Sequence, residues 1–248
     1  MPSSFPGTWR GVVGIIKPTL RPGSLEEFIR LLPEGIGVIP MFIGVKEGVV
    51  GEFLDNMDLM KRKIAELAEL KVDLIHPEGA PFFTFMGYHR AAEIVKELET
   101  EHATPIVTTG MTLVEASRAL AIKKLIIFSS FDDAGEKIRF QKHSAYFREA
   151  GFDVLAIEGM PVKFADIGGL SSFECYAFAK NLYLRHPECD GICMMGSGWR
   201  VMDIIPFLEQ DFQIPVVHPV AARVWAIQKR LHVRQPVKGC GRLLEELP

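Results

Sequence analysis

The chain contains the same strand-and-turn segment twice. Residues 72–79 read Val-Asp-Leu-Ile-His-Pro-Glu-Gly and residues 189–196 read Cys-Asp-Gly-Ile-Cys-Met-Met-Gly, so an aspartate and a final glycine match in the two copies. A second short apolar segment containing a proline follows each copy, within 104–108 and 214–218. A chain built from two similar α/β halves usually binds its ligand between them, and backbone amides at two such turns suit a carboxylate. The repeat therefore predicts two matched halves around a small anionic ligand.

Short apolar runs alternate with longer amphipathic segments along the whole chain. We predict strands at 12–16, 36–42, 74–75, 106–107, 125–128, 154–157, 192–195 and 216–217. We predict helices that begin at Ser24, span 52–70, 88–98 and 113–120, run from Asp132 or Asp133 to 149, and span 173–184, 201–209 and 221–231. Ser24 is expected to cap its helix, with Glu27 at the capping-box position. Uninterrupted apolar strands that alternate with helices are typical of a doubly wound α/β fold with parallel sheets, whose ligands lie beyond the carboxyl ends of the strands.

The composition excludes several classes of protein. The 248 residues allow one large α/β domain or two small halves that share an interface, and the formal net charge is −3. No basic stripe is present, so nucleic acid is not an expected partner. No run approaches the ~18 apolar residues of a membrane span. The segment 1–7 lacks the features of a signal peptide, so we expect a cytoplasmic protein. Four cysteines are too few for a disulfide scaffold. Cys189 and Cys193 are four residues apart, but the residues between them are typical of a strand and no second Cys or His pair has zinc-type spacing, so a structural metal site is not expected.

The carboxyl-terminal third holds several short segments whose order and spacing are characteristic. These segments are 190–192 (Asp-Gly-Ile), 196–200 (Gly-Ser-Gly-Trp-Arg), 203–206 (Asp-Ile-Ile-Pro), 214–217 (Ile-Pro-Val-Val), Trp225 and 239–244 (Gly-Cys-Gly-Arg-Leu-Leu). Weaker similarity reaches back to 14–16 and 32–35. Together they resemble the aspartate/glutamate/hydantoin racemase superfamily, and within it the branch of arylmalonate decarboxylase and maleate cis-trans isomerase.

The resemblance implies a two-lobed fold of flavodoxin-like halves, with parallel sheets and the ligand site between them. We assign 1–110 plus the tail 219–248 to the first half and 111–218 to the second half. The resemblance also implies chemistry next to a carboxylate, without metal or organic cofactor, by one or two cysteines at the ends of paired strands. Members of the superfamily often form dimers, so a homodimer or higher homo-oligomer is expected.

The sequence departs from this family at the two cysteine positions, which fall on Gly79 and Gly196. One glycine is compatible with the decarboxylase, which keeps only the second cysteine, but two glycines leave no thiol at either position. Cys193 lies earlier in the same apolar strand, where a buried structural thiol is expected because free cysteine is among the most buried residue types. Racemisation by two thiols is therefore not expected.

Three ionisable side chains at strand ends are candidates to replace the thiols as catalytic groups: Glu78, His76 and His218. A carboxylate in a desolvated cleft has a raised pKa and can transfer a proton, and histidine does the same work near neutral pH. Each has a structural alternative. His76 could be a core histidine with satisfied hydrogen bonds, and His218 could form a hydrogen bond with a neighbouring loop. Glu78 could be a solvated loop charge or the partner of a helix N-terminus. Two histidines and a glutamate could also form a catalytic metal site, although the spacing does not require one.

Other positions are expected to contact the ligand. They are Lys17, Gly79, Ala80, Ser129, Ser130, Gly196, Ser197 and Gly198. The residues of the two turns offer backbone amides, and the two serines end a strand where related enzymes place polar carboxylate-binding groups. Lys17 could pair with an anionic substrate. Phe131 stands near the point where the decarboxylase has a tyrosine, so that hydroxyl is absent here.

These expectations define one predicted function and two alternatives. We predict a cofactor-independent enzyme that acts on a small carboxylate or carbonyl compound through an enolate-like intermediate, as a decarboxylase, isomerase or racemase would. Glu78 and a histidine would serve as acid and base. The first alternative is a hydrolase of an amide or ester on the same scaffold. The second is a non-catalytic carboxylate-binding protein that kept the binding turns and lost the thiols.

Overall fold

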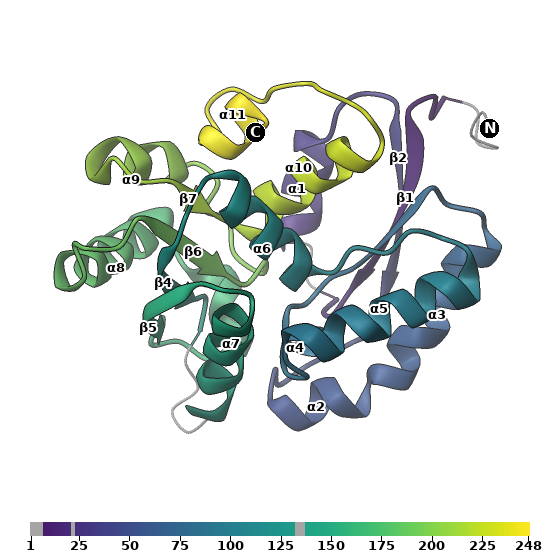
Figure 1. Ribbon diagram of the computed structural model, residues 1–248, viewed down its shortest axis with the longest axis horizontal. Helices are drawn as coiled ribbons and strands as arrows, with labels where there is room; N and C mark the ends of the chain where they lie inside the picture. Colours follow the sequence, from purple (N-terminus) through teal and green to yellow (C-terminus); the bar gives the residue numbers. More distant parts are fainter. Residues whose placement is uncertain (1–6, 21–22, 132–136) are drawn as a thin grey trace.

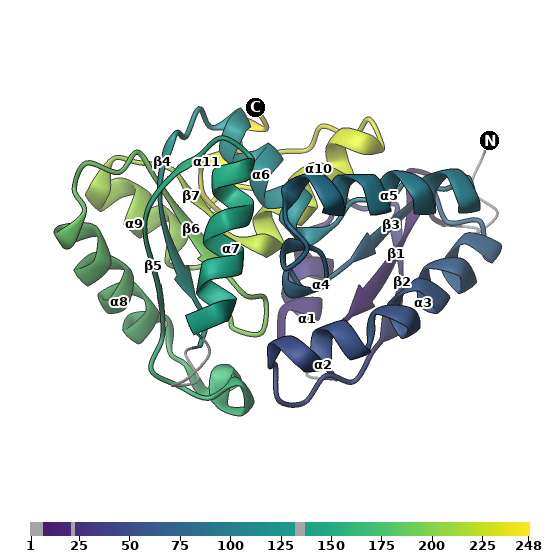
Figure 2. The same cartoon turned by 60° about the horizontal axis from the view of Figure 1, so that its bottom comes forward.

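The chain folds into two lobes that lie side by side, each built on a parallel sheet (Figure 1 and Figure 2). The computed structural model describes residues 7–20, 23–131 and 137–248. The first sheet has the order β2-β1-β3 and the second has the order β5-β4-β6-β7. The strands are β1 (Gly11–Lys17), β2 (Ile36–Phe42), β3 (Leu74–Pro77), β4 (Lys124–Ser129), β5 (Asp153–Gly159), β6 (Gly191–Met195) and β7 (Val216–Val217). The central strands β1 and β6 are buried along their whole length, which explains their uninterrupted apolar sequence.

Helices follow the strands in both lobes. In the first lobe they are α1 (Gly23–Leu31), α2 (Val50–Asp55), α3 (Met57–Glu69), α4 (Pro81–Thr84) and α5 (Tyr88–His102). The remaining helices are α6 (Thr109–Ala119), α7 (Lys137–Glu149), the 3-10 helix η1 (Phe164–Gly169), α8 (Ser172–Arg185), α9 (Ile205–Phe212), α10 (Pro219–Arg230) and α11 (Arg242–Glu246). Among the described residues, no helix is long and apolar enough to cross a membrane. The predicted two-lobed α/β fold with parallel sheets is confirmed.

The repeated aspartate has the same structural role in both lobes. The Asp73 carboxylate accepts a hydrogen bond of 2.7 Å from the amide of Val12, at the start of β1. The Asp190 carboxylate accepts bonds of 2.8 Å and 2.7 Å from the amides of Lys123 and Lys124, at the start of β4. In both lobes the aspartate therefore fixes the beginning of the neighbouring strand, whose first amides would otherwise lack a partner.

The second segment of each repeat also pairs in the same way. The amide of Ile75 donates to the carbonyl of Pro105 at 2.9 Å, and the amide of Ile192 donates to the carbonyl of Pro215 at 3.0 Å. In the second lobe this contact belongs to the two-residue strand β7, whereas in the first lobe it is an isolated bridge at Ile106. The strand predicted at 106–107 is therefore reduced to one bridge.

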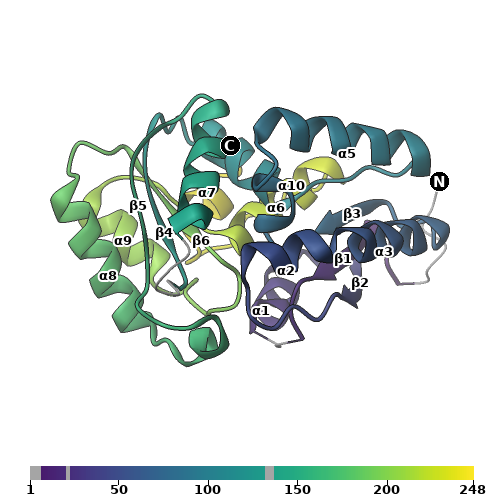
Figure 3. The same ribbon diagram turned by 90° about the horizontal axis from the view of Figure 1, so that it is seen from below.

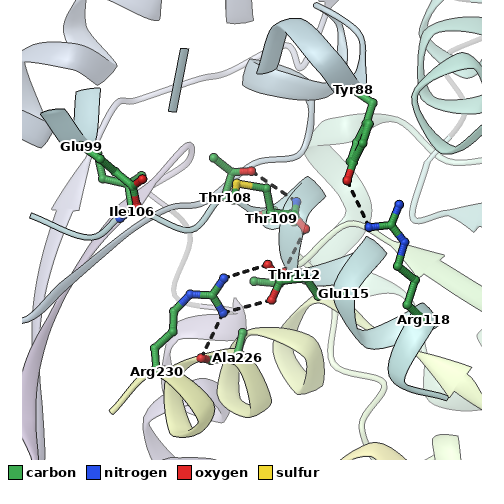
Figure 4. Close-up of polar contacts among 11 residues, drawn as sticks. Tyr88, Glu99, Ile106, Thr108, Thr109, Thr112, Glu115, Arg118, Ala226 and Arg230 are labelled. Carbon is green, nitrogen blue, oxygen red and sulfur yellow. Dashed lines mark hydrogen bonds and ion pairs between the residues drawn. The ribbon is translucent and has the colours of Figure 1, made fainter. Parts of the chain in front are cut away.

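Helices α6 and α10 lie between the lobes and follow the second segment of each repeat (Figure 3). Thr108 caps α6 by accepting a hydrogen bond from the amide of Met111, and His218 caps α10 in the corresponding place. Figure 4 shows that Arg230 of α10 forms a two-pronged ion pair with Glu115 of α6, at 2.8 Å and 3.1 Å. This contact joins the end of α10 to the middle of α6, away from the capped N-termini.

Several predicted element boundaries differ from the structure. The helix predicted over 52–70 is two helices, because Asn56 ends α2 and its side chain donates a hydrogen bond back to the carbonyl of Glu52. Helix α1 begins at Gly23, so Ser24 lies within the helix rather than at its N-cap. The proposed caps Asp132 and Asp133 lie outside the described residues.

Two further helices begin at other residues than predicted. Helix α6 begins four residues earlier than predicted, because Thr108 supplies the cap, and α9 begins four residues later, with proline in its first turn.

Replacing Asp190 by alanine tests the structural role of the repeated aspartate. We expect Asp190→Ala to lower the free energy of unfolding by about 1–2 kcal/mol, because two strand amides lose a charged acceptor. Urea denaturation monitored by circular dichroism measures the change. Glu188→Ala is the matched control two residues earlier, where the side chain is exposed, and its effect should stay below about 0.5 kcal/mol. Equal stability of Asp190→Ala and the native protein would contradict the proposed role.

Candidate active site

A cavity of about 80 Å³ lies between the lobes, at the carboxyl ends of the strands. All eight residues expected to contact a ligand line it: Lys17, Gly79, Ala80, Ser129, Ser130, Gly196, Ser197 and Gly198. Its remaining walls are largely apolar and include Phe53, Phe131 and Phe164. The two copies of the sequence repeat thus meet at a single concave site, which is the usual position of a ligand in this kind of fold.

A buried group of three charges lies against this cavity. The Glu78 carboxylate forms an ion pair with Arg223 at 2.7 Å and a second one with Lys17 at 3.5 Å. The hydroxyl of Ser197 donates to the same carboxylate at 2.7 Å. Glu78 follows β3, Lys17 ends β1, Ser197 lies in the second glycine turn and Arg223 belongs to α10. One carboxylate therefore connects the first lobe to the second turn and to the helix between the lobes.

The charge group determines the ionisation of its members. Burial alone would raise the pKa of Glu78, but Arg223, Lys17 and the Ser197 hydroxyl outweigh burial and hold that pKa well below its usual range. Burial lowers the pKa of Lys17, Glu78 opposes this effect, and Arg223 adds to it. Glu78 is thus a fixed carboxylate that positions Lys17 and Ser197, and its low pKa makes it a poor proton donor at neutral pH.

The two histidines expected to act beside Glu78 are buried, and neither lines the cavity. His76 Nε2 lies 3.4 Å from the hydroxyl of Thr109. His218 Nδ1 accepts a hydrogen bond of 3.3 Å from the amide of Val220, as the N-cap of α10. Burial, together with the nearby Arg223, lowers the pKa of each histidine to about 3. The structure therefore brings Glu78 together with Lys17 and Ser197, and gives both histidines contacts within the protein.

The two turns present backbone amides without an acceptor in the described part of the chain. The amides of Gly79 and Ala80, and those of Ser197 and Gly198, donate to no described carbonyl or side chain. Gly79 and Gly196 have φ angles of +95° and +102°, a conformation that L side chains rarely adopt. These glycines allow the chain to turn sharply at the cavity wall, where an anion could accept from the free amides.

Gly196 has no room for a side chain. A Cβ atom built on it would lie 2.2 Å from the hydroxyl oxygen of Ser130. A cysteine at this position would require the Ser130 side chain to shift and would have a strained φ. The predicted burial of Cys193 is confirmed, and burial raises the pKa of its thiol, so it is not a reactive group. In the described residues, no group of three or more His, Cys, Asp or Glu is arranged to hold a metal ion.

Sequence reasoning did not identify three charged or polar residues of this region. Arg139 and His143 line the cavity from α7, and Arg223 binds Glu78. Arg139 and His143 are four residues apart, so they share one helix face, and both are buried. A polar pair on the buried face of the predicted helix was the available signal. For Arg223 the signal was a single charge within an otherwise apolar run of α10.

The fold and the site define a class of α/β proteins that have two similar lobes and a cavity between two glycine turns. Residues 30–244 match the family model of arylmalonate decarboxylase. The chain therefore belongs to the arylmalonate decarboxylase family, as the sequence predicted. A search of curated proteins gave no match.

Solved structures of enzymes share the fold. Maleate isomerase from Pseudomonas putida S16, in complex with maleate, is 20% identical with a TM-score of 0.83, over 95% of this chain and 97% of that chain. A liganded mutant of arylmalonate decarboxylase is 16% identical with a TM-score of 0.86, over 95% and 99%. Maleate cis-trans isomerase from Nocardia farcinica, in a mutant with a covalent succinylcysteine, is 19% identical with a TM-score of 0.84, over 95% and 98%. The relatives are thus a lyase and isomerases.

The buried histidines predict an acid-sensitive fold. Unfolded histidine takes up a proton near pH 6.5, whereas burial lowers the pKa of His76, His143 and His218 to about 3. Between these values the unfolded chain binds more protons, so the free energy of unfolding falls as the pH drops, by up to ~1.4 kcal/mol per pH unit for each histidine. Below about pH 4.3 Glu78 adds to the loss of stability. Its contacts with Arg223, Lys17 and Ser197 stabilise the folded protein only while its carboxylate is ionised.

Urea denaturation at several pH values between about 7.5 and 4.5 measures this dependence. His89→Gln, which changes an exposed ring, is the control and should keep the native slope. A free energy of unfolding that stays constant over this interval would show that the three rings are not buried in the neutral form.

Gly196→Ala tests the steric limit at the second turn. We expect a loss of about 1–3 kcal/mol in the free energy of unfolding, because the new methyl group has an unfavourable φ and meets the Ser130 hydroxyl. Adding Ser130→Ala should restore part of the loss by removing the clash. Gly51→Ala is the control, since Gly51 lies in a helix with open space around it and should be neutral or stabilised. A stable Gly196→Ala single variant would contradict the geometry.

Proposed function

We propose that this protein is a cofactor-independent enzyme that acts on a small carboxylate through an enolate-like intermediate, as a lyase or isomerase without a catalytic thiol. The observation that carries the proposal is the single cavity in which Lys17 and the unpaired amides of two glycine turns converge. Family membership and the substrates in the names of its relatives support the same chemistry. Oriented donors of this kind stabilise negative charge as it develops on a carboxylate oxygen.

Lys17 is proposed to bind the substrate carboxylate. Its side chain is 4% exposed and lines the cavity, and its amino group forms an ion pair with the buried carboxylate of Glu78. A buried cation whose position is fixed costs little reorganisation when an anion binds, which favours tight and oriented binding. Ser129, Ser130 and the second turn offer further polar contacts on the opposite wall.

Glu78, His76 and His218 are proposed to shape the site and not to transfer protons. The low pKa of Glu78 supports a role as permanent anion that orients Lys17 and Ser197, and not as the proton donor. His76 and His218 stay neutral near pH 7 because burial lowers their pKa values to about 3. Their contacts with Thr109 and Val220 support a part in shaping the strand ends behind the cavity.

The proposal is tested by turnover after alkylation with iodoacetamide. The substrates are phenylmalonate, an alkenylmalonate and maleate. Their reactions are monitored by ¹H NMR, which detects loss of CO₂, isomerisation or uptake of solvent deuterium. We expect activity to survive, because no described cysteine lines the cavity and the thiol of Cys193 is buried. Loss of activity together with labelling of Cys193 would contradict the thiol-independent mechanism.

Variants of Lys17 separate binding from chemistry. We expect Lys17→Met to raise KM by about tenfold or more, since the carboxylate loses a buried ion pair. Lys61→Met, at an exposed position of α3, is the control and should keep the native KM. Binding of a carboxylate by the native protein without any turnover would replace the proposed enzyme by a carboxylate-binding protein.

A further inference from the structure

The cavity has three ionisable side chains among the described residues that line it: Lys17, Arg139 and His143. Lys17 and Arg139 are cations suited to binding an anion. Glu78, His76 and His218, which the sequence predicts to transfer protons, do not line the cavity. His143 is therefore the described lining residue whose side chain is an uncharged base in contact with the cavity.

The hydrogen bonds around Thr84 fix the tautomer of His143. The hydroxyl of Thr84 donates its single hydrogen to the carbonyl of Ala80 at 2.8 Å. The same oxygen lies 2.9 Å from His143 Nδ1, so in this contact it must accept. Nδ1 therefore carries the ring hydrogen, and Nε2 carries a lone pair. Thr84 belongs to α4 of the first lobe and His143 to α7 of the second, so this bond also spans the cleft.

The position of the ring leaves Nε2 available to a bound molecule. The His143 ring packs against Phe85 with 5.1 Å between centroids, and Nδ1 is turned to Thr84. No described residue forms a hydrogen bond with Nε2, although His143 lines the cavity. A nucleophile or base held by a second side chain, which is itself anchored, is the usual arrangement of a catalytic proton acceptor.

The surroundings keep the ring neutral, which is the form that accepts a proton. Burial lowers the pKa of His143 to about 3, and Arg139 contributes in the same direction. Arg139 lies one turn earlier on α7, stacks on Phe131 at 3.9 Å and donates to the Phe131 carbonyl at 3.1 Å. Thr84, the last residue of α4, and Phe85, which follows it, contact the ring and carry no charge. A substrate carboxylate would offset the field of Arg139 and raise the basicity of the ring.

We propose that Nε2 of His143 is the catalytic proton acceptor of this cavity, a step that rests on the proposed function. The carbon–hydrogen bond next to the substrate carboxylate breaks, its proton moves to Nε2, and its electron pair passes into the enolate. Lys17 and the turn amides hold the enolate oxygens. The ring becomes an imidazolium that still donates from Nδ1 to Thr84, and it then returns a proton to the same carbon. Atoms and electrons balance without any other reactant.

The experiment follows exchange of the α-hydrogen of 2-phenylpropionate and of succinate with solvent deuterium by ¹H NMR. We expect His143→Gln to lower kcat by about 10²-fold or more with KM little changed, because the amide keeps the size and polarity of the site but cannot take up the proton. His89→Gln is the control at an exposed position and should keep the native rate.

Thr84 provides a second test that keeps the histidine in place. In native protein labelled with ¹⁵N-histidine, the ring shifts of His143 should report hydrogen on Nδ1 and a lone pair on Nε2. Thr84→Val removes the acceptor and should move the hydrogen to Nε2 and lower kcat, whereas Thr84→Ser should restore the native tautomer and rate. Circular dichroism verifies that the variants fold.

The outcomes separate this inference from the proposed function. Exchange in the native protein that persists at a similar rate in His143→Gln would overturn the role of His143 and leave the proposed function intact. A hydrogen on Nε2 in the native protein would also overturn it. Absence of exchange and of any turnover in the native protein would overturn the proposed function, and the catalytic role of His143 with it.

Discussion

The site depends on one buried carboxylate. Glu78 lies between Arg223 and Lys17 and accepts a further hydrogen bond from Ser197. Breaking such a buried pair by removing one partner leaves an uncompensated charge and costs about 3–5 kcal/mol, so each member holds the others in place. Because these residues come from β1, from the second turn and from α10, the same carboxylate fixes the cavity wall and the mutual position of the lobes. Ligand binding and folding therefore rely on one set of contacts.

A division of roles follows from this arrangement. A carboxylate held by two cations stays ionised, so it is effective at positioning charge and ineffective at giving up a proton. Proton transfer then needs a group outside the charge cluster, with access to the cavity. His143 meets this condition, because its neighbours across the cleft are the uncharged residues Thr84 and Phe85. The lining of one cavity thus includes a charged group, Lys17, and a neutral base, His143.

The repeat in the sequence was sufficient to predict the two lobes and the position of the cavity. Asp73 and Asp190 mark equivalent strand starts, and the two glycines mark equivalent turns, because local backbone geometry requires these residue types. Arg223 and His143 escaped prediction for a different reason. Their roles arise from tertiary contacts with Glu78 and Thr84, which are distant in sequence, and neither residue type at a single helix position indicates such a partner.

The glycine of the second turn is coupled to the rest of the site. The Ser130 hydroxyl occupies the space that a Cβ at Gly196 would need, and the Ser130 amide donates to the carbonyl of Met195 at 3.0 Å, which fixes the backbone of Ser130 beside the turn. A cysteine at the second turn would require a change at Ser130 as well, and the new thiol would lie beside Ser197, whose hydroxyl is engaged with Glu78. Gly196, Ser130 and the charge group around Glu78 are therefore structurally dependent on one another. Chemistry in this cavity must come from the side chains that the cluster leaves accessible.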